Sequence, residues 1–359
     1  MDEVSLFPTR LDRETSRSGP ELSSTRKRQT KSSTLVNHCL IALIGLVITP
    51  FVSGAQGSPP SQNGSGDEYT LRLDANMVIL SATVLDRHNI PVSGLDKGDF
   101  QVYEEGKLQQ IMQFSHDDIP VTAGILVDNS GSMGPKRDGV IAAAMAFARS
   151  SNPQDQMFVV NFNDRVSFGL PPGMPFTDRQ EELKLALSRI RTIGQTSLYD
   201  GIVDALDHLN QGTRDKKVLI LISDGGDNVS KHSLAQALGM AKQTTAIIYA
   251  IGIFDEQDGD QNPTVLRRLA RETGGEAFFP ESSKEVISIC EGIARDIRSQ
   301  YTLAYVPAIA AEDGSYRTVE VRASAHGRGR LSVRTRAGYS VPLAMPAGAT
   351  KAILHDSRN

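Results

Sequence analysis

The sequence lacks the residues on which several common protein classes depend. Its 359 residues include no tryptophan and two cysteines, Cys39 and Cys290, so neither a disulfide framework nor a zinc site of four thiolates can form. The 38 Lys and Arg against 42 Asp and Glu argue against a generic nucleic-acid binder, because phosphate neutralisation requires a basic surface. No stretch resembles a bundle of membrane helices.

Short catalytic motifs are missing as well. The sequence contains no Gly-x-Ser-x-Gly elbow, no His-Glu-x-x-His pattern and no Walker glycine loop, and its seven histidines are scattered singly. A Ser–His hydrolase would therefore have no local signature here. The length and a hydrophobic content of 39% instead fit a soluble globular body of two domains, or of one domain with additions.

The N-terminal part of the chain has the pattern of an export signal. Residues 1–34 are polar and contain a basic cluster at 26–31, directly before an apolar run at 35–52. Small residues at 53–55 then provide a cleavage site. Because positive charge stays on the cytoplasmic side, we expect residues 1–34 to be a disordered cytoplasmic region and 35–55 a signal peptide or signal anchor. A buried core helix is the alternative.

Export determines the compartment that we expect. The chain would be periplasmic, on the cell surface or secreted, or anchored in the membrane by residues 35–52. Removal of residues 1–55 would leave Cys290 alone, which suits an oxidising compartment because no intrachain disulfide could form. Residues 56–68 are rich in Gly, Ser, Pro and Asn and predict a flexible linker, and residues 342–359 predict a disordered tail.

Apolar strands alternate with amphipathic helices between residues 121 and 299. Four segments are short and continuously apolar, like strands buried on both faces of a parallel sheet: 124–127, 158–162, 218–222 and 246–251. Helical periodicity covers 140–149, 181–191, 199–210, 233–244, 265–273 and 284–298. This alternation predicts an α/β domain with a doubly wound, mostly parallel open sheet.

The segments on either side of this domain carry strand patterns. In residues 69–120, an apolar β-branched run at 77–85 precedes a hairpin-like stretch at 100–114. Strand patterns return in residues 300–341. We expect the two flanking segments to pair and to form one β-sandwich. Two separate small sheets are the alternative.

Polar residues follow two of the apolar strands at the point where each strand ends. Asp128-x-Ser130-x-Ser132 follows the first strand and Asp224 the third, while Thr196 lies in a loop that leads into a helix. Ligands of open α/β sheets bind at the carboxyl ends of the strands. Side-chain oxygens suit a hard divalent cation such as Mg²⁺, whereas zinc would require His or thiolate. The triplet alone could equally be a turn in which a serine caps the following helix.

These residues resemble a known family. Three motifs are similar to the metal-ion-dependent adhesion site of von Willebrand factor type A (VWFA) domains: 128–132 (DNSGS), 194–200 (GQTSLYD) and 223–225 (SDG). The flanks resemble an exported VWFA-related group known best from Acidobacteria, through the segments 95–106, 301–307 and 334–339. The resemblance covers nearly everything from residue 77 to residue 339, and it implies a Rossmann-like fold for the α/β domain.

The resemblance also implies a metal site made of Asp128, Ser130, Ser132, Thr196 and Asp224. The two serines would bond the metal directly, Thr196 would do so when a partner is engaged, and the two carboxylates would act mainly through water. Neutral hydroxyls next to the metal leave it under-neutralised, so it attracts an Asp or Glu carboxylate of a protein partner. We expect Mg²⁺, with Mn²⁺ or Ca²⁺ as alternatives.

The sequence therefore predicts an exported binding or adhesion module rather than an enzyme. Its partner would be a protein, with no nucleic acid and with membrane contact only through the N-terminal segment. One alternative is an envelope assembly scaffold with a vestigial metal site. The other is a metal-assisted hydrolase, which would need a general base beyond the two carboxylates. We assign no role to Asn129, and we expect Asp227 to be a solvated turn residue.

Overall fold

The computed structural model of the chain describes residues 77–254, 261–309 and 314–341. These residues belong to one compact unit, Thr70–Asn359. The predicted cytoplasmic region, signal segment, linker and C-terminal tail lie outside the described residues. Within the described ranges, no helix has both the length and the apolar character that crossing a membrane requires.

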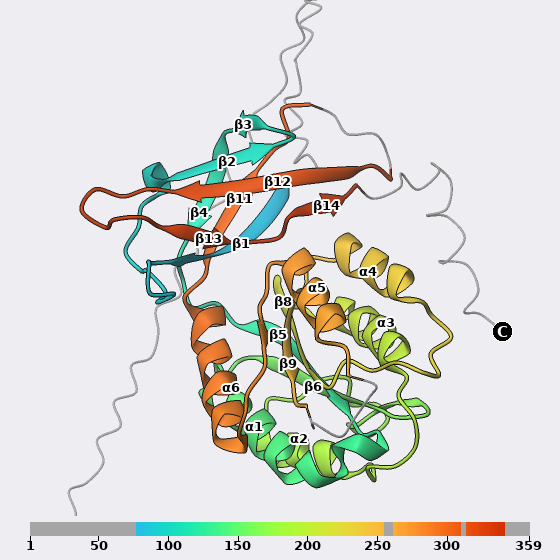
Figure 1. Cartoon of the computed structure of the whole chain (residues 1–359). Helices are drawn as coiled ribbons and strands as arrows, with labels where there is room; N and C mark the ends of the chain where they lie inside the picture. The colour runs from blue at the N-terminus through green and yellow to red at the C-terminus, as the bar shows by residue number, and fades with distance from the viewer. Residues whose placement is uncertain (1–76, 255–260, 310–313, 342–359) are drawn as a thin grey trace, which may run out of the picture. The chain divides into compact units, whose positions relative to one another are not determined.

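A six-stranded sheet forms the centre of the α/β part, with the strand order β10-β9-β8-β5-β6-β7 (Figure 1). Its strands are β5 (Val121–Asp128), β6 (Gln156–Phe162), β7 (Val166–Phe168), β8 (Lys216–Ser223), β9 (Ile247–Gly252) and β10 (Ala277–Phe278). Neighbouring strands pair in parallel, except that β7 runs antiparallel to β6. The doubly wound, mostly parallel sheet that the apolar runs predict is confirmed.

Two groups of helices cover the two faces of this sheet, as Figure 1 shows. One group consists of α1 (Arg137–Ser150), α2 (Gln180–Ser188) and α6 (Ser283–Arg298), in which α1 packs on both α2 and α6. The other consists of α3 (Leu198–Asn210), α4 (Leu234–Gln243) and α5 (Pro263–Thr273). Local signals set several helix ends: the Asn262 side chain caps α5 by accepting from Val265 N, and Gly274 ends α5 at φ +84°.

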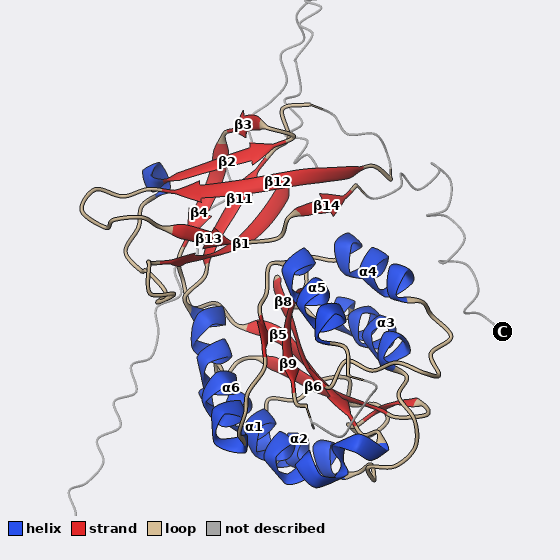
Figure 2. Ribbon diagram, viewed as in Figure 1, coloured by secondary structure: helices blue, strands red, loops and turns tan. Residues whose placement is uncertain are grey.

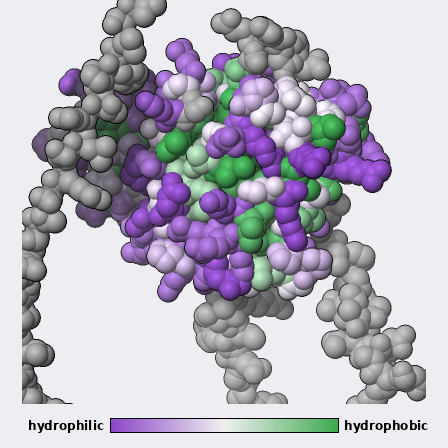
Figure 3. Space-filling view, turned by 90° about the horizontal axis from the view of Figure 1, so that it is seen from below, coloured by the Kyte–Doolittle hydropathy of each residue, from purple (hydrophilic) through white to green (hydrophobic). Residues whose placement is uncertain are grey.

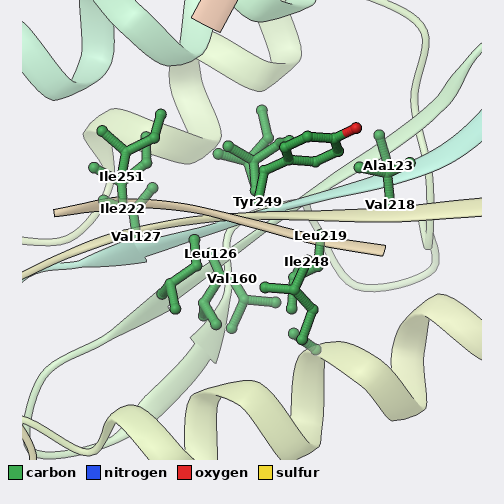
Figure 4. Close-up of a cluster of buried hydrophobic side chains, with 14 of the residues drawn as sticks. Ala123, Leu126, Val127, Val160, Val218, Leu219, Ile222, Ile248, Tyr249 and Ile251 are labelled. Atoms are coloured by element: carbon green, nitrogen blue, oxygen red, sulfur yellow. The ribbon is translucent and has the colours of Figure 1, made fainter. Parts of the chain in front are cut away.

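Apolar side chains occupy both faces of the central sheet. Figure 4 shows Leu126, Val160, Leu219 and Ile248 on one face and Val127, Ile222, Tyr249 and Ile251 on the other. Successive side chains of a strand point to opposite faces, so a strand covered on both sides must be apolar along its whole length. Polar side chains are therefore concentrated where the strands end, and this places the candidate site.

Two four-stranded antiparallel sheets make up the rest of the described chain. Their strand orders are β13-β1-β11-β4 and β14-β12-β2-β3. The strands are β1 (Val78–Leu85), β2 (Phe100–Glu104), β3 (Lys107–Gln109), β4 (Ile111–Ser115), β11 (Tyr301–Tyr305), β12 (Tyr316–Ala323), β13 (Ser332–Arg334) and β14 (Gly338–Ser340). Figure 2 shows these strands apart from the helices that surround the central sheet.

Each of the two antiparallel sheets combines strands from both flanks of the α/β part. Leu80 of β1 lies opposite Leu303 of β11, and Val102 of β2 lies opposite Val321 of β12. All four side chains belong to one buried cluster, and each such side chain contributes about 1.5–3 kcal/mol through burial. The predicted β-sandwich is confirmed, and the alternative of two separate small sheets is wrong because the flanks pair with each other.

A buried carboxylate joins the sandwich to the α/β part. Asp296 of α6 accepts hydrogen bonds from the hydroxyls of Tyr249 in β9 (2.6 Å) and Thr83 in β1 (2.9 Å). Arg334 of β13 forms an ion pair with the same carboxylate. Burial next to Asp296 raises the pKa of Tyr249 well above its usual value, which keeps its hydroxyl protonated as a donor.

Candidate metal-binding site

Three loops meet at the carboxyl ends of the central strands. Asp128 is the last residue of β5, and Asp224 directly follows β8. The two strands pair in parallel, with Val127 opposite Ile222, so both carboxylates lie at the same edge of the sheet. Asp128 and Asp224 are each 2% exposed. Adjacent buried carboxylates repel each other unless a positive charge lies between them.

A chain of hydrogen bonds connects four of the five predicted residues. The Asp128 carboxylate accepts from the backbone N–H of Ser130 at 2.8 Å. The hydroxyl oxygens of Ser130 and Ser132 are 3.1 Å apart, and Ser132 donates to Asp224 Oδ2 at 2.8 Å. Ser223 Oγ donates to the second oxygen of Asp128 at 2.7 Å. Residues almost 100 positions apart are thus joined through side-chain oxygens.

Thr196, the fifth predicted residue, is brought to this edge by its backbone. Its N–H donates to Asn228 Oδ1 at 2.8 Å, and Asn228 N–H donates back to Thr196 O at 3.0 Å. The same loop accepts a bond from Gly131 N through Gly194 O at 3.0 Å. Among the described residues, the Thr196 hydroxyl forms no hydrogen bond with Asp128, Ser130, Ser132 or Asp224. The loop that carries Thr196 is therefore bonded to both neighbouring loops, whereas the Thr196 hydroxyl is not part of the hydrogen-bond chain.

Asn129, to which the sequence alone assigns no role, holds several elements together. Asn129 is buried, and its Nδ2 donates to Asn161 Oδ1 at 2.9 Å. Its own Oδ1 accepts from Arg137, which also donates to Thr192 Oγ1 at 3.0 Å. One side chain thus links the ends of β5 and β6 to α1 and, through Arg137, to the loop that carries Thr196. Its position between two candidate ligands was the only sequence signal.

Asp227, expected to be a solvated turn residue, is partly exposed but also bonds other segments. Asp227 Oδ1 accepts from the backbone N–H of Tyr199 at 3.2 Å and from the hydroxyl of Ser230. It therefore supplies an acceptor to the first turn of α3, where helix N–H groups have no partner within the helix. Together with Asn228, Asp227 fastens the loop after Asp224 to the loop that carries Thr196.

Position 225 requires glycine for a structural reason that the sequence did not indicate. Its φ is +83°, and a Cβ at this position would lie 2.5 Å from the carbonyl oxygen of Asn262. The backbone of another segment packs closely here, which only glycine permits.

Burial dominates the electrostatics of the site. Burial raises the pKa of Asp128 to about 6, hydrogen bonds from Ser130 and Ser223 oppose that rise, and the charge of Asp224 adds to it. No Lys, Arg or His nitrogen of the described residues lies within 4 Å of the Asp128 carboxylate. Ionised Asp128 is therefore a buried negative charge that a bound cation could balance.

The available donor atoms at this edge are oxygens. Within the described ranges, no group of three or more His, Cys, Asp or Glu side chains is placed to hold a metal ion. A metal at this edge would thus depend on the Ser and Thr hydroxyls in addition to the two carboxylates. Such a donor set fits a hard divalent cation of the Mg²⁺ type and does not fit one that needs thiolate or imidazole.

Comparison with known proteins identifies the α/β part. The family model of the von Willebrand factor type A domain matches residues 124–291, from β5 into α6. Residues 124–291 form a von Willebrand factor type A domain. This type A domain includes all five candidate residues of the metal site. The match does not extend to the sandwich, which flanks the type A domain on both sides in sequence.

Several solved structures are similar to the chain. A von Willebrand factor type A protein from Catenulispora acidiphila is 14% identical, with a TM-score of 0.46 over 76% of this chain and 74% of that one. The vWF domain of a type V pilus tip protein from Porphyromonas gingivalis is 14% identical, with a TM-score of 0.43 over 50% and 95%. Proximal thread matrix protein 1 of the mussel byssus, with zinc in its MIDAS motif, is 18% identical, with a TM-score of 0.42 over 50% and 48%. No curated protein matches the chain.

Proposed function

We propose that this chain is a binding module that captures an acidic side chain of a protein partner through a divalent cation. The cation would be held by Asp128, Ser130, Ser132, Thr196 and Asp224, with Mg²⁺ the first candidate and Mn²⁺ or Ca²⁺ as alternatives. The observation that carries this proposal is the chain of hydrogen bonds that runs from Ser130 through Ser132 to Asp224. It supports a shared centre for side chains from separate loops.

Each of the five residues would have a distinct part in this function. Ser130 and Ser132 offer neutral oxygens, so they would hold a cation without cancelling its charge. Asp128 and Asp224 offer the negative charge that makes uptake of a cation favourable at a buried site. A divalent cation held in this way would offer a coordination position to a carboxylate from outside the chain. Thr196, whose loop is bonded to the loops of Ser130 and Asp224, would complete the set.

Binding is favoured over catalysis by the chemistry of the same residues. Metal-assisted hydrolysis requires a general base that takes a proton from water, within hydrogen-bond reach of the reacting atoms. The two carboxylates of the candidate site are already engaged with Ser130, Ser132 and Ser223. The alternative is a scaffold whose metal site is vestigial. A measurement of cation uptake distinguishes this scaffold from the proposed binding module.

We also propose that the chain works outside the cytoplasm. The basic cluster at 26–31, the apolar run at 35–52 and the small residues at 53–55 support this proposal. The partner would then be a protein of the envelope, the cell surface or the surroundings, and membrane contact would be limited to the N-terminal segment. Fractionation of cells that express the full chain, followed by protein blotting, tests the compartment.

Partner capture in the presence and absence of chelator tests the function. The full chain is immobilised, incubated with envelope extract in Mg²⁺, and eluted with EDTA. We expect specific proteins in the eluate of the wild type and none with Asp128→Ala. The matched control is Asp207→Ala, which removes an exposed carboxylate from α3. Capture that is unchanged by EDTA or by Asp128→Ala would contradict the proposal.

A further inference from the structure

A hollow lined by arginines opens at one side of the type A domain. It has a volume of about 470 Å³ and lies between α5 and the start of β10, which is the outermost strand of the central sheet. Its lining includes Arg267, Arg268 and Arg271, all on α5 and all exposed. Residues three or four positions apart share one face of a helix, so these side chains reach the same hollow. Hollows of this size hold small-molecule ligands in many proteins.

Neighbouring carboxylates do not balance the positive charge of this hollow. None of the three arginines forms an ion pair or a side-chain hydrogen bond with the described residues. Glu272, the one carboxylate of α5, pairs with Lys242 of α4 at 3.3 Å instead. Glu276, which also lines the hollow, forms an ion pair with Arg334 of the sandwich. In a chain with a formal charge of −4, the hollow is therefore a local excess of positive charge.

A hydrophilic surface does not by itself indicate a site. Figure 3, seen from below relative to Figure 1, shows hydrophilic residues along the border of one face of the molecule. Charged side chains of this protein pair with one another elsewhere on its surface, as Arg298 does with Asp118 at 2.7 Å. The arginines of the hollow differ from such pairs because three of them share one space without a carboxylate partner among the described residues.

One of the three guanidinium groups is held in place by aromatic rings. Arg267 lies over the ring of Phe279, with 4.3 Å between its guanidinium carbon and the ring centroid. Phe279 in turn stacks on Phe254, with 5.4 Å between the ring centroids. A guanidinium that stacks through its face can still donate through the N–H groups along its edge. Arg267 is therefore oriented in advance for an oxyanion, and it loses little side-chain entropy when one binds.

We propose that this hollow binds the phosphate group of an anionic ligand. Three guanidinium groups offer more donors than the two oxygens of a single carboxylate can accept. A phosphate monoester has three strong acceptor oxygens and a charge of about −1.5 to −2 at pH 7, and arginine binds phosphate through two parallel hydrogen bonds. This site does not depend on the cation, because none of its residues is among the five candidate metal ligands.

Three small anions test the proposal on the full chain in EDTA, where no divalent cation can contribute. Phenyl phosphate carries the expected group, benzoate places a carboxylate on the same ring, and inorganic phosphate lacks the ring. Calorimetric titration measures the three affinities. We expect phenyl phosphate to bind about tenfold more tightly than benzoate, because one additional charge-assisted hydrogen bond is worth about that factor. Inorganic phosphate that binds as tightly as phenyl phosphate would identify free phosphate as the ligand, and weaker binding would identify a phosphate ester.

Matched variants locate the binding. Arg268→Gln and Arg271→Gln each remove one guanidinium from the hollow, whereas Arg149→Gln removes an exposed arginine from α1. We expect each of the first two variants to weaken phenyl phosphate binding about tenfold and Arg149→Gln to leave it unchanged. All three positions are exposed, so the melting temperatures of the variants should equal that of the wild type.

Several results would overturn the proposal. They are no binding of phenyl phosphate at millimolar concentration, benzoate binding as tightly as phenyl phosphate, or equal affinities in Arg268→Gln and Arg149→Gln. Tighter binding of benzoate would favour an acidic peptide as the ligand. Asp128→Asn should bind phenyl phosphate as the wild type does. Phosphate binding that requires both Mg²⁺ and Asp128 would place the anion at the candidate metal site, which overturns this proposal and supports the proposed cation site.

Discussion

Buried carboxylates in two regions of this chain have different neighbours. In the sandwich, Glu104 accepts from the hydroxyls of Tyr305 at 2.6 Å and Tyr339 at 2.9 Å, and an Arg317 nitrogen lies 3.4 Å away. At the edge of the type A domain, Asp128 accepts from a backbone N–H and the Ser223 hydroxyl. The described residues place no cationic nitrogen within 4 Å of it. The ion pair with Arg317 balances the charge of Glu104, whereas Asp128 forms no ion pair with the described residues.

A third buried carboxylate, Asp155, shows that the lack of an ion pair is not specific to the candidate metal site. Asp155 also has no cationic nitrogen of the described residues within 4 Å. One of its oxygens accepts from Val121 N at 2.7 Å and the other from Asn152 N at 3.1 Å, so backbone groups engage both. The lack of an ion pair therefore does not by itself mark a metal site. What distinguishes Asp128 is its place in a set of hydroxyls and a second carboxylate from other loops.

The largest expected effect comes from breaking the sandwich network. Glu104→Ala should lower the free energy of unfolding by about 3–5 kcal/mol, because it breaks the ion pair with Arg317 and removes the acceptor of two tyrosine hydroxyls. Glu320→Ala is the control, since its ion pair with Arg322 is exposed and exposed pairs contribute little to stability. Asp128→Asn in EDTA should not lower stability, because it removes an unbalanced buried charge. Denaturant titration measures the free energy of unfolding of all three variants. If Asp128→Asn loses as much stability as Glu104→Ala, the two carboxylates do not differ as we conclude.

Stability without divalent cations should depend on pH with a defined sign. Burial raises the pKa of Asp128 and Asp155 from 3.8 to about 6, so between these values the folded chain holds protons that the unfolded chain has lost. The free energy of unfolding therefore falls as pH rises through this window, by up to about 3 kcal/mol for each group.

Mg²⁺ should offset only the share of this loss that Asp128 contributes. The rise in melting temperature that Mg²⁺ causes is then larger at about pH 7.5 than at about pH 5. Asp155→Asn should reduce the pH dependence and leave the Mg²⁺ effect in place. Differential scanning fluorimetry at the two pH values gives the answer. An equal Mg²⁺-induced rise in melting temperature at both pH values would show that Asp128 does not take part in cation binding.

Removal of a single hydroxyl should weaken cation binding while the fold persists. Ser132→Ala takes away the oxygen that bonds Asp224, and we expect about a 100-fold loss of Mg²⁺ affinity, or about 2.7 kcal/mol. Ser188→Ala, at an exposed position on α2, should leave the affinity unchanged. Calorimetric titration of both variants distinguishes a ligand from a serine that merely caps the turn. If Ser132→Ala binds Mg²⁺ as tightly as the wild type, Ser132 is a capping residue of the turn rather than a cation ligand.

The smallest effect should come from a residue that acts through Thr196. Asn228→Ala removes the acceptor of the Thr196 N–H, and we expect about a tenfold loss of Mg²⁺ affinity because the loop is less well positioned. Asn210→Ala, exposed at the end of α3, serves as the matched control. Loss of melting temperature without loss of affinity would limit Asn228 to a role in stability.

The sequence predicted the elements that one physical pattern determines. Strands buried on both faces appear as continuous apolar runs, and all four such runs are strands of the central sheet. Edge strands carry less information: β7 and β10 have three and two residues, too few for a pattern. The helix expected over 181–191 ends at Ser188, where Arg189 reaches Gly169 O and tertiary contacts replace helical ones.

The residues of the candidate site likewise fall into those that a sequence pattern predicts and those that it does not. Asp128 and Asp224 could be placed together from the sequence because parallel neighbouring strands end at one edge. Asn129, Asp227 and Asn228 could not, because their partners lie on other loops and nothing in the local pattern specifies a hydrogen bond between loops. Residues that bind are recognisable by chemistry and spacing, whereas those that position the binding residues emerge only with the fold.

Calorimetric titration of the full, metal-stripped chain with Mg²⁺ tests the central claim most directly. The account predicts uptake of about one ion per chain, lost in Asp128→Asn and retained in Asp207→Asn. No heat of binding at millimolar Mg²⁺, or the same binding curve for wild type and Asp128→Asn, would contradict it.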